Sequence, residues 1–224
     1  MPVRFPRPVY ERLRSAAADS RMSMNAYVVE AVQGKLGMTT WKADRTVRKI
    51  PTLFVRDFDN DPRYVTRDVT PGCEWVLKGE GVPTRKYDGT CVMWDGNRWW
   101  ARREVKPGKQ APAGFTEVEH DRETGKTVGW EPAEQSSFAR HLASAIGYSD
   151  PEPGTYELVG PKINGNPEQM DCNALVPHGE LEFDDVPRDF DGLAAWLLAH
   201  PWEGIVWHHP DGRMAKLKRR DFPA

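Results

Sequence analysis

A lysine, an aspartate and a glycine stand within four residues in the segment Lys86-Tyr87-Asp88-Gly89. A lysine amine can act as a nucleophile when its environment favours the neutral, deprotonated form. A glycine lets the backbone approach a bound group closely. If the segment is extended, Lys86 and Asp88 point to the same side. Taken alone, the tetrapeptide is more typical of a surface hairpin, in which Asp-Gly forms the turn and the lysine is solvated. Its chemistry therefore depends on the rest of the chain.

Three further blocks follow along the chain, and each places carboxylates or lysines beside short apolar runs. In chain order they are Tyr156-Glu157-Leu158-Val159-Gly160, Glu203-Gly204-Ile205-Val206-Trp207 and Lys216-Leu217-Lys218-Arg219-Arg220-Asp221-Phe222. Together with the lysine segment, they resemble motifs I, III, IV and V of the covalent nucleotidyltransferases, the superfamily of polynucleotide ligases and capping enzymes. The four blocks in this order form a specific signature, whereas the first block alone does not.

Shorter segments make the resemblance closer. They are residues 86–91, 100–102, 106–110, 129–132, 163–167, 177–179 and 203–208. Together they look like the compact ATP-dependent 5′-to-3′ RNA ligases of vertebrates, phages and microbes, from about Phe54 to Phe222. This resemblance implies the nucleotidyltransferase (ligase adenylation) fold, adenylation of the motif I lysine, and the joining of RNA 5′-phosphate and 3′-hydroxyl ends.

The resemblance implies that Lys86 is the nucleophile that takes AMP from ATP. AMP would then pass to an RNA 5′-phosphate, and a 3′-hydroxyl would displace it to form the phosphodiester. A free lysine has a pKa of about 10.4, so this chemistry requires a lower pKa for Lys86. We expect a metal ion, the cations Lys216 and Lys218, and partial desolvation to lower it.

The other site residues are also implied by the resemblance. Glu157 and Glu203 would bind Mg²⁺ or Mn²⁺ mostly through water, and the ion would neutralise the α-phosphate and align the pyrophosphate leaving group. Lys216 and Lys218 alternate along a predicted strand, so both would point into one cleft as catalytic cations on the α-phosphate. The implied ATP-binding set is Lys86, Asp88, Gly89, Arg102, Glu157, Glu203, Lys216 and Lys218.

Several of these residues have plainer interpretations. Residues 216–220 could be a solvated basic tail, and Glu157 could have a structural hydrogen-bonding role. His208 and His209 have no third partner at metal-ligand spacing, so we interpret them as surface or substrate-side residues. Arg85 departs from the resemblance, because many RNA ligases have an acidic residue directly before the nucleophilic lysine. This departure bears on purine recognition and hence on the preference for ATP.

The elements that must position these residues occupy residues 51–224, where short β-rich runs alternate with Gly, Pro, Asn and Asp. Asp95-Gly96-Asn97 and Thr124-Gly125-Lys126 predict hairpin turns. Apolar spacing predicts helices near 138–146 and from about Asp191 to Pro201, and residues 74–77 are predicted as a strand. We therefore expect an α+β domain of antiparallel sheets with flanking helices.

Residues 1–37 form a separate module in a basic N-terminal part of the chain. A short strand at 3–5, a helix with Pro8 in its first turn, and a second helix from Ser23 to Gly37 resemble a ribbon-helix-helix module. In that family, paired strands enter the DNA major groove. Prolines on both sides of the short strand limit its pairing, so homodimerisation or packing is favoured over DNA contact. Residues 38–50 are predicted to be a linker.

The composition describes an ordinary globular protein, because the 224-residue chain has a net charge of -2, 29% charged residues and 39% hydrophobic residues. No apolar run approaches the roughly 18 residues that span a bilayer, and the N-terminus has no signal-peptide core. We therefore expect a cytoplasmic protein without membrane contact. Cys73, Cys91 and Cys172 stand far apart, which predicts reduced thiols rather than disulfides or a zinc cluster.

Two alternatives to an RNA ligase stay open. The chain could be a DNA ligase or nick-sealing enzyme of the same superfamily, or a nucleic-acid-binding regulator with a non-catalytic ligase-like domain. The regulator requires broken motifs, but the motif lysines and carboxylates are present. The sequence continues only two residues past Phe222, so we expect no oligonucleotide-binding domain after motif V. This expectation disfavours a capping guanylyltransferase or a typical DNA ligase.

Overall fold

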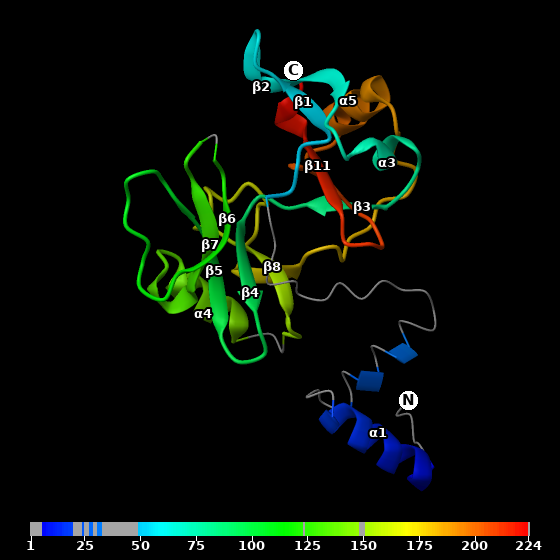
Figure 1. The fold of residues 1–224 in the computed structure, drawn as a ribbon, viewed down its shortest axis with the longest axis vertical. Coiled ribbons are helices and arrows are strands. Elements are labelled where there is room, and N and C mark those ends of the chain that lie inside the picture. Colours follow the sequence, from blue (N-terminus) through cyan, green and yellow to red (C-terminus); the bar gives the residue numbers. More distant parts are fainter. Residues whose placement is uncertain are drawn as a thin grey trace. The chain divides into compact units, whose positions relative to one another are not determined.

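The computed structural model describes residues 6–19, 24, 27–28, 31–32, 49–122, 124–147 and 151–223. The chain divides into two compact units, Met1–Trp41 and Lys42–Ala224. In Figure 1, helix α1 belongs to the first unit and all the labelled strands belong to the second.

In the first unit, α1 spans Arg7–Asp19. Pro8 lies in the first turn of α1, as predicted, because a missing N–H there costs no helical hydrogen bond. Ala17 is the buried residue of this helix. The predicted strand at 3–5, the predicted N-cap Ser23 and residues 38–48 lie outside the described residues. The ribbon-helix-helix module and the linker therefore stay predictions.

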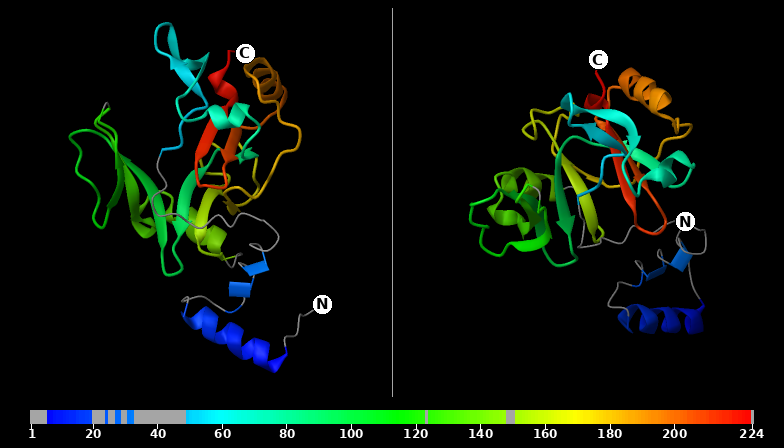
Figure 2. Two further views of the ribbon diagram at one scale, coloured as in Figure 1. Left: turned by 45° about the vertical axis from the view of Figure 1, so that its right-hand side comes forward. Right: turned by 45° about the horizontal axis from the view of Figure 1, so that its top comes forward.

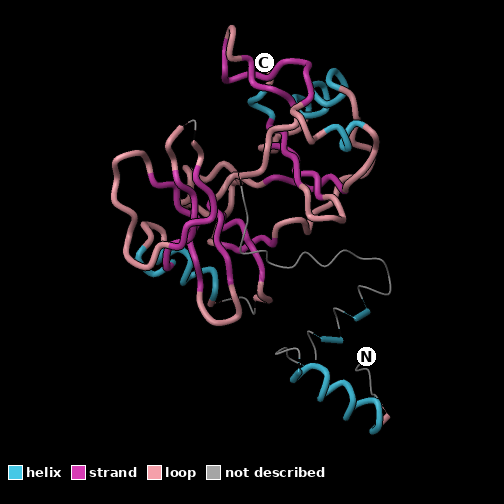
Figure 3. Tube along the Cα trace, viewed as in Figure 1, coloured by secondary structure: helices cyan, strands magenta, loops and turns pink. Residues whose placement is uncertain are grey.

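In the described part of the second unit, the strands form three antiparallel sheets, drawn in magenta in Figure 3. The six-stranded sheet has the order β6 (Thr116–His120), β7 (Thr127–Pro132), β5 (Trp99–Val105), β4 (Thr90–Trp94), β8 (Gly154–Val159) and β9 (Ala174–Pro177). The three-stranded sheet has the order β11 (Met214–Lys218), β10 (Gly204–His208) and β3 (Val82–Lys86). The third sheet pairs β1 (Phe54–Asp57) with β2 (Asp61–Val69). The mixed architecture agrees with the expected α+β class.

The helices of this unit are short: α3 (Glu74–Leu77), α4 (Ala139–Ile146), α5 (Phe190–Ala199) and the 3-10 turns η1 (Ala133–Gln135) and η2 (Arg219–Asp221). Asp189 caps α5 because its carboxylate accepts a hydrogen bond from the Gly192 N–H at 2.9 Å. Both predicted helices and the hairpin turn through Gly96 are confirmed. None of the described helices is long and apolar enough to cross a membrane.

The prediction of a strand over residues 74–77 is wrong. These residues form α3, which buries Trp75 and Val76 in the core. The Glu74 carboxylate accepts hydrogen bonds from the Gly72 N–H at 2.9 and 3.1 Å. A four-residue apolar run has too few positions to distinguish a strand from a helix by periodicity, so tertiary packing decides its structure.

Each of the two larger sheets packs one face against a helix. Val92 and Ala101 of the six-stranded sheet pack in one cluster with Leu142 of α4. Ile205 and Leu217 of the three-stranded sheet pack in another cluster with residues of α5. Figure 2 shows both sheets from two further sides. Side chains alternate along a strand, so the residues next to these core positions point to the faces opposite the helices.

The candidate site residues lie on those opposite faces. On the three-stranded sheet they are Lys86, Lys216 and Lys218, and on the six-stranded sheet Glu157. The chain passes directly from β3 to β4 through the turn that contains Gly89. The lysine segment therefore connects the two sheets, and the prediction that Lys216 and Lys218 share one side of a strand is confirmed.

Candidate functional site

Glu203 lies between two strand ends and binds two lysines. Lys86 ends β3 and Lys218 ends β11, and both are opposite Gly204, the first residue of the central strand β10. The Glu203 carboxylate accepts a hydrogen bond from the Nζ atom of each lysine at 2.5 Å. The side chains of Lys86, Glu203 and Lys218 are only 21%, 10% and 15% exposed, respectively. They form a partly buried charge cluster, which we call the Glu203 cluster.

Two glycines allow the close approach of the strands around this cluster. A Cβ atom on Gly204 would lie 2.2 Å from the carbonyl oxygen of Leu217. A Cβ atom on Gly89 would lie 2.3 Å from the carbonyl oxygen of Leu158. A larger residue at either position would push neighbouring strands apart. Gly89 therefore brings the turn after the lysine against β8, the strand that carries Glu157.

The carboxylates keep Lys86 in its ammonium form. Burial alone would lower the pKa of Lys86, but the charges of Glu203 and Glu157 outweigh burial and raise that pKa above its usual value. Burial would raise the pKa of Glu203, whereas the charges of Lys86 and Lys218 lower it. The structure thus shows the opposite of the expected lowering at Lys86. The amine must leave the Glu203 carboxylate before it can act as a nucleophile.

Lys216 is the lysine whose pKa falls. It lies two residues before Lys218 on the same face of β11. Burial, followed by the charges of Lys218 and Lys86, lowers the pKa of Lys216 to about 8. An anion beside these cations would favour the charged form of Lys216 and reduce the repulsion among the lysines. The arrangement is therefore suited to binding a phosphate group.

Glu157 connects the six-stranded sheet to the turn after Lys86. Its Oε1 atom accepts a hydrogen bond from the Gly89 N–H at 3.1 Å, and its Oε2 atom lies 2.8 Å from Nε2 of His178. Glu157 is 9% exposed. The structural hydrogen-bonding role considered for this residue is therefore present. Each carboxylate oxygen has a second lone pair beyond these hydrogen bonds.

A second glutamate, which the sequence did not point to, holds the same turn. The Oε1 atom of Glu168 accepts a hydrogen bond from the Asp88 N–H at 2.7 Å, and its Oε2 atom accepts one from Nη2 of Arg85 at 2.5 Å. The Glu168 side chain is only 6% exposed, and the Arg85 guanidinium lies 4.3 Å from the ring centroid of Tyr87. Arg85, the departure from the family pattern, is thus half of an ion pair beside the predicted nucleophile.

The loop that carries Glu168 has an unusual backbone. Asn164, Asn166 and Gln169 have positive φ angles of 48°, 62° and 53°, a region that non-glycine residues rarely occupy. The Asn164 side-chain amide donates hydrogen bonds to the Gly89 carbonyl oxygen at 2.6 Å and to Oδ1 of Asp88 at 3.2 Å. The loop therefore fixes the backbone on the C-terminal side of Lys86.

The remaining predicted residues lie as follows. Arg102 is next to Ala101 on β5, on the same sheet face as Glu157, and its Cζ atom lies 5.7 Å from the Trp130 ring centroid. The interpretation of His208 as a surface residue is wrong, because His208 is 5% exposed in β10, whereas its interpretation as a substrate-side residue stays a prediction. Its Nε2 atom lies 3.1 Å from Oγ1 of Thr84, and burial, followed by the charge of a second histidine, lowers its pKa to about 4.

The other histidine and the cysteines do not form a metal site. His209 lies 3.0 Å from a Glu80 carboxylate oxygen. Cys73 is buried, Cys91 is half-buried and Cys172 is exposed, and all three are free thiols, as predicted. Among the described residues, no group of three or more His, Cys, Asp or Glu side chains could hold a metal ion by itself.

Comparison with known proteins gives a consistent result. A family model described as RNA ligase 1 matches residues 141–223, a range that contains Glu157, Glu203, Lys216 and Lys218. RNA ligase 1 of Pongo abelii is 26% identical over 258 residues, which cover 77% of this chain and 79% of that protein. RNA ligase 1 of Rattus norvegicus is 27% identical and that of Danio rerio is 23% identical, with the same coverage. Both comparisons support an RNA ligase family.

The carboxylates fit the kind of metal site that such an enzyme would use. Magnesium keeps much of its water and is usually held by one or two carboxylates together with substrate phosphates. Glu203 and Glu157 each accept two hydrogen bonds and have lone pairs left. The predicted pair of metal ligands is therefore compatible with Mg²⁺, provided that phosphate oxygens and water complete the coordination.

Proposed function

We propose that this chain is an ATP-dependent RNA ligase that joins 5′-phosphate and 3′-hydroxyl ends through a covalent intermediate on Lys86. This proposal rests on one observation: three lysines converge at one sheet face, and Glu203 lies between two of them. The lysines are Lys86, Lys216 and Lys218. A buried carboxylate beside three lysines is suited to a reaction in which negative phosphate charge must be neutralised. The similarity to RNA ligase 1 proteins supports RNA as the substrate.

The proposed reaction begins when the neutral Lys86 amine attacks the α-phosphorus of ATP. A nitrogen–phosphorus bond forms, the bond to pyrophosphate breaks, and the amine loses its proton. An RNA 5′-phosphate oxygen then attacks the same phosphorus and displaces the lysine. Finally, a 3′-hydroxyl attacks the RNA phosphate and AMP leaves. Lys216 and Lys218 stabilise the charge on the phosphate in each step.

The geometry of the Glu203 cluster suggests how Lys86 becomes neutral. Glu203 holds the lysine as an ammonium group in this structure. A divalent cation would supply positive charge at Glu203 and at the phosphates. Lys86, released from its carboxylate and surrounded by Lys216 and Lys218, would then have a lower pKa because the charge of Glu203 no longer offsets burial.

The decisive experiment incubates the purified chain with α-labelled ATP and Mg²⁺, denatures it, and measures the label retained. We expect covalent label with ATP and its loss when 5′-phosphorylated RNA is added, together with the appearance of joined RNA. Matched RNA and DNA strands with nicks and with free ends distinguish the RNA ligase from a DNA ligase. Label without transfer to either acceptor would contradict the joining reaction, and absence of label with both ATP and GTP would contradict the covalent mechanism.

Replacement of Glu168 tests the positioning of the lysine segment. Glu168→Ala removes the acceptor of the Asp88 N–H and leaves the Arg85 guanidinium, 21% exposed, without its carboxylate. We expect the free energy of unfolding to fall by about 3 kcal/mol or less, because one partner of a partly buried ion pair is removed. We also expect the rate of labelling at saturating ATP to fall about tenfold or more, since Lys86 loses its fixed geometry.

The measurements are urea denaturation and single-turnover labelling. Glu180→Ala replaces an exposed glutamate of the same unit and serves as the matched control. Glu168→Gln retains an acceptor for the Asp88 N–H and should fall between the wild-type protein and Glu168→Ala. Labelling at the wild-type rate by a folded Glu168→Ala variant would show that this hydrogen bond does not position Lys86.

A further inference from the structure

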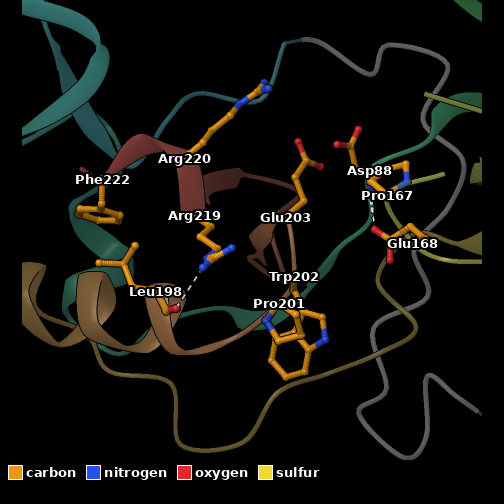
Figure 4. A pocket seen from close by; sticks show the side chains of 10 residues that line it. All are labelled: Asp88, Pro167, Glu168, Leu198, Pro201, Trp202, Glu203, Arg219, Arg220 and Phe222. Carbon is orange, nitrogen blue, oxygen red and sulfur yellow. Dashed lines mark hydrogen bonds between the residues drawn. The ribbon is translucent and has the colours of Figure 1, made fainter. Parts of the chain in front are cut away.

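A cavity of about 350 Å³ borders the Glu203 cluster (Figure 4). Asp88 and Glu203 contribute carboxylates to its wall, Trp202 and Phe222 contribute aromatic rings, and Arg219 and Arg220 line it from the end of β11. The cavity therefore combines apolar, cationic and carboxylate groups beside the Glu203 cluster.

The charges in this cavity favour the binding of an anion near Arg219 and Arg220. The carboxylates of Glu203 and Glu168 are already paired, with Lys86 and Lys218 and with Arg85, respectively. The carboxylate of the half-buried Asp88 accepts one hydrogen bond from an asparagine side chain.

The two arginines of the cavity differ from the paired carboxylates Glu203 and Glu168 in their ion-pair contacts. Arg219 and Arg220 are exposed, and neither forms an ion pair with a carboxylate among the residues that the structure describes. The Arg219 guanidinium only reaches the carbonyl oxygen of Leu198, at 3.5 Å. Both guanidinium groups are thus available to bind phosphate.

The backbone that presents these arginines is fixed. The buried Asp221 accepts a hydrogen bond from the Lys218 N–H at 2.8 Å and one from Nη2 of Arg56 at 2.7 Å. Asp221 thereby closes the turn η2 and directs the chain away from β11. Arg219 and Arg220 follow Lys218 directly in the sequence, and their side chains point in different directions (Figure 4). Two separate cations of this kind are suited to successive phosphates of a chain rather than to a single ion.

The apolar wall of the cavity is also rigid. The Trp202 ring stacks on Phe183 at 4.6 Å between ring centroids and on His200 at 4.6 Å. Phe222 is 5% exposed and packs against Phe190 at 5.3 Å between ring centroids. Rigid aromatic surfaces beside arginines are typical of sites that bind single-stranded nucleic acid.

We propose that this cavity binds the RNA strand next to the end being joined, with Arg219 and Arg220 on backbone phosphates and Trp202 beside the sugar and base. This inference rests on the proposed ligase function and names the part of the site that binds the RNA to which AMP is transferred. An alternative role for Arg219 and Arg220 is to bind the triphosphate tail of ATP. The two roles predict different effects of the same substitutions.

The test replaces both arginines in the full chain. Arg219→Ala with Arg220→Ala should weaken the binding of a 5′-phosphorylated single-stranded RNA about tenfold or more near 0.1 M salt. The slope of log K against log salt concentration should decrease by about 0.7 for each phosphate that the variant no longer neutralises. Labelling by ATP should stay within about twofold of the wild-type rate, because the Glu203 cluster is intact. Fluorescence anisotropy measures RNA binding without ATP, so the result does not depend on adenylation.

Arg140→Ala is the matched control. Arg140 is an exposed arginine on α4, and α4 packs against the face of the six-stranded sheet opposite Glu157. Its replacement should leave RNA affinity unchanged, whereas Arg219→Lys with Arg220→Lys should restore most of the affinity. Unchanged RNA affinity in the double alanine variant would overturn the proposal. An increased KM for ATP with unchanged RNA affinity would assign the cavity to the triphosphate instead.

The design separates this proposal from the proposed function. If the wild-type chain is never labelled by ATP, the ligase mechanism fails, and anisotropy still decides whether the cavity binds RNA. If the wild-type chain is labelled and joins RNA while the double alanine variant does so equally well, only the cavity assignment fails.

Discussion

Lys86→Ala should abolish covalent labelling of the chain by α-labelled ATP. The amine of Lys86 is the proposed nucleophile, and its neighbours Lys216 and Lys218 extend from a different strand. The loss of a covalent nucleophile cannot be replaced by electrostatic stabilisation, because no bond to the phosphorus can form. Denaturing electrophoresis after incubation with ATP and Mg²⁺ measures the retained label.

Two control variants separate this chemical role from the fold. Lys86→Arg keeps a cation beside Glu203 and should fold normally, but it should also remain unlabelled, since a guanidinium stays protonated. Lys78→Ala removes an exposed lysine at the end of α3 and should be labelled like the wild type. Label retained by Lys86→Ala would place the covalent bond on another residue and would end the assignment of Lys86.

The sequence was sufficient where local signals decide the structure. Asp95-Gly96-Asn97 predicted the β4–β5 hairpin because its residues favour a tight turn. The apolar spacing near 138–146 and the proline at 201 predicted α4 and the end of α5. The alternation of Lys216 and Lys218 predicted their common face. In each case the information lies within a few neighbouring residues.

The sequence alone was insufficient where contacts between residues far apart in the chain determine the structure. Arg85 and Glu168 are 83 positions apart, and no spacing rule connects them. The burial of His208 depends on its place in the central strand β10, which pairs on one side with β3, a strand from a distant part of the chain. The raised pKa of Lys86 likewise depends on carboxylates from β8 and from the start of β10. The interactions between these charged groups, and the burial of these residues, arise only when the strands are assembled and cannot be derived from the local sequence.

Glu203→Ala should lower metal-dependent labelling about 100-fold or more, although it has two opposing effects. The substitution removes the carboxylate that raises the pKa of Lys86, and each unit of lowered pKa gives about ten times more neutral amine near neutral pH. It also removes a proposed metal ligand, and the loss of one preorganised electrostatic group in an active site typically costs about 10²–10³ in rate. We expect the second effect to dominate. The two partly buried lysines would also lose their shared partner, at a cost of about 3 kcal/mol in the free energy of unfolding.

Labelling rates at several Mg²⁺ concentrations, together with urea denaturation, measure both effects. Glu203→Gln keeps the acceptor oxygen between Lys86 and Lys218 but removes the charge, so it should recover stability more than activity. Glu134→Ala removes an exposed glutamate that pairs with Arg98 and should change neither quantity appreciably. Wild-type labelling by Glu203→Ala would remove Glu203 from the site. Faster labelling would instead mean that the release of Lys86 from its carboxylate limits the reaction, because metal binding would then depend on Glu157 and the phosphates alone.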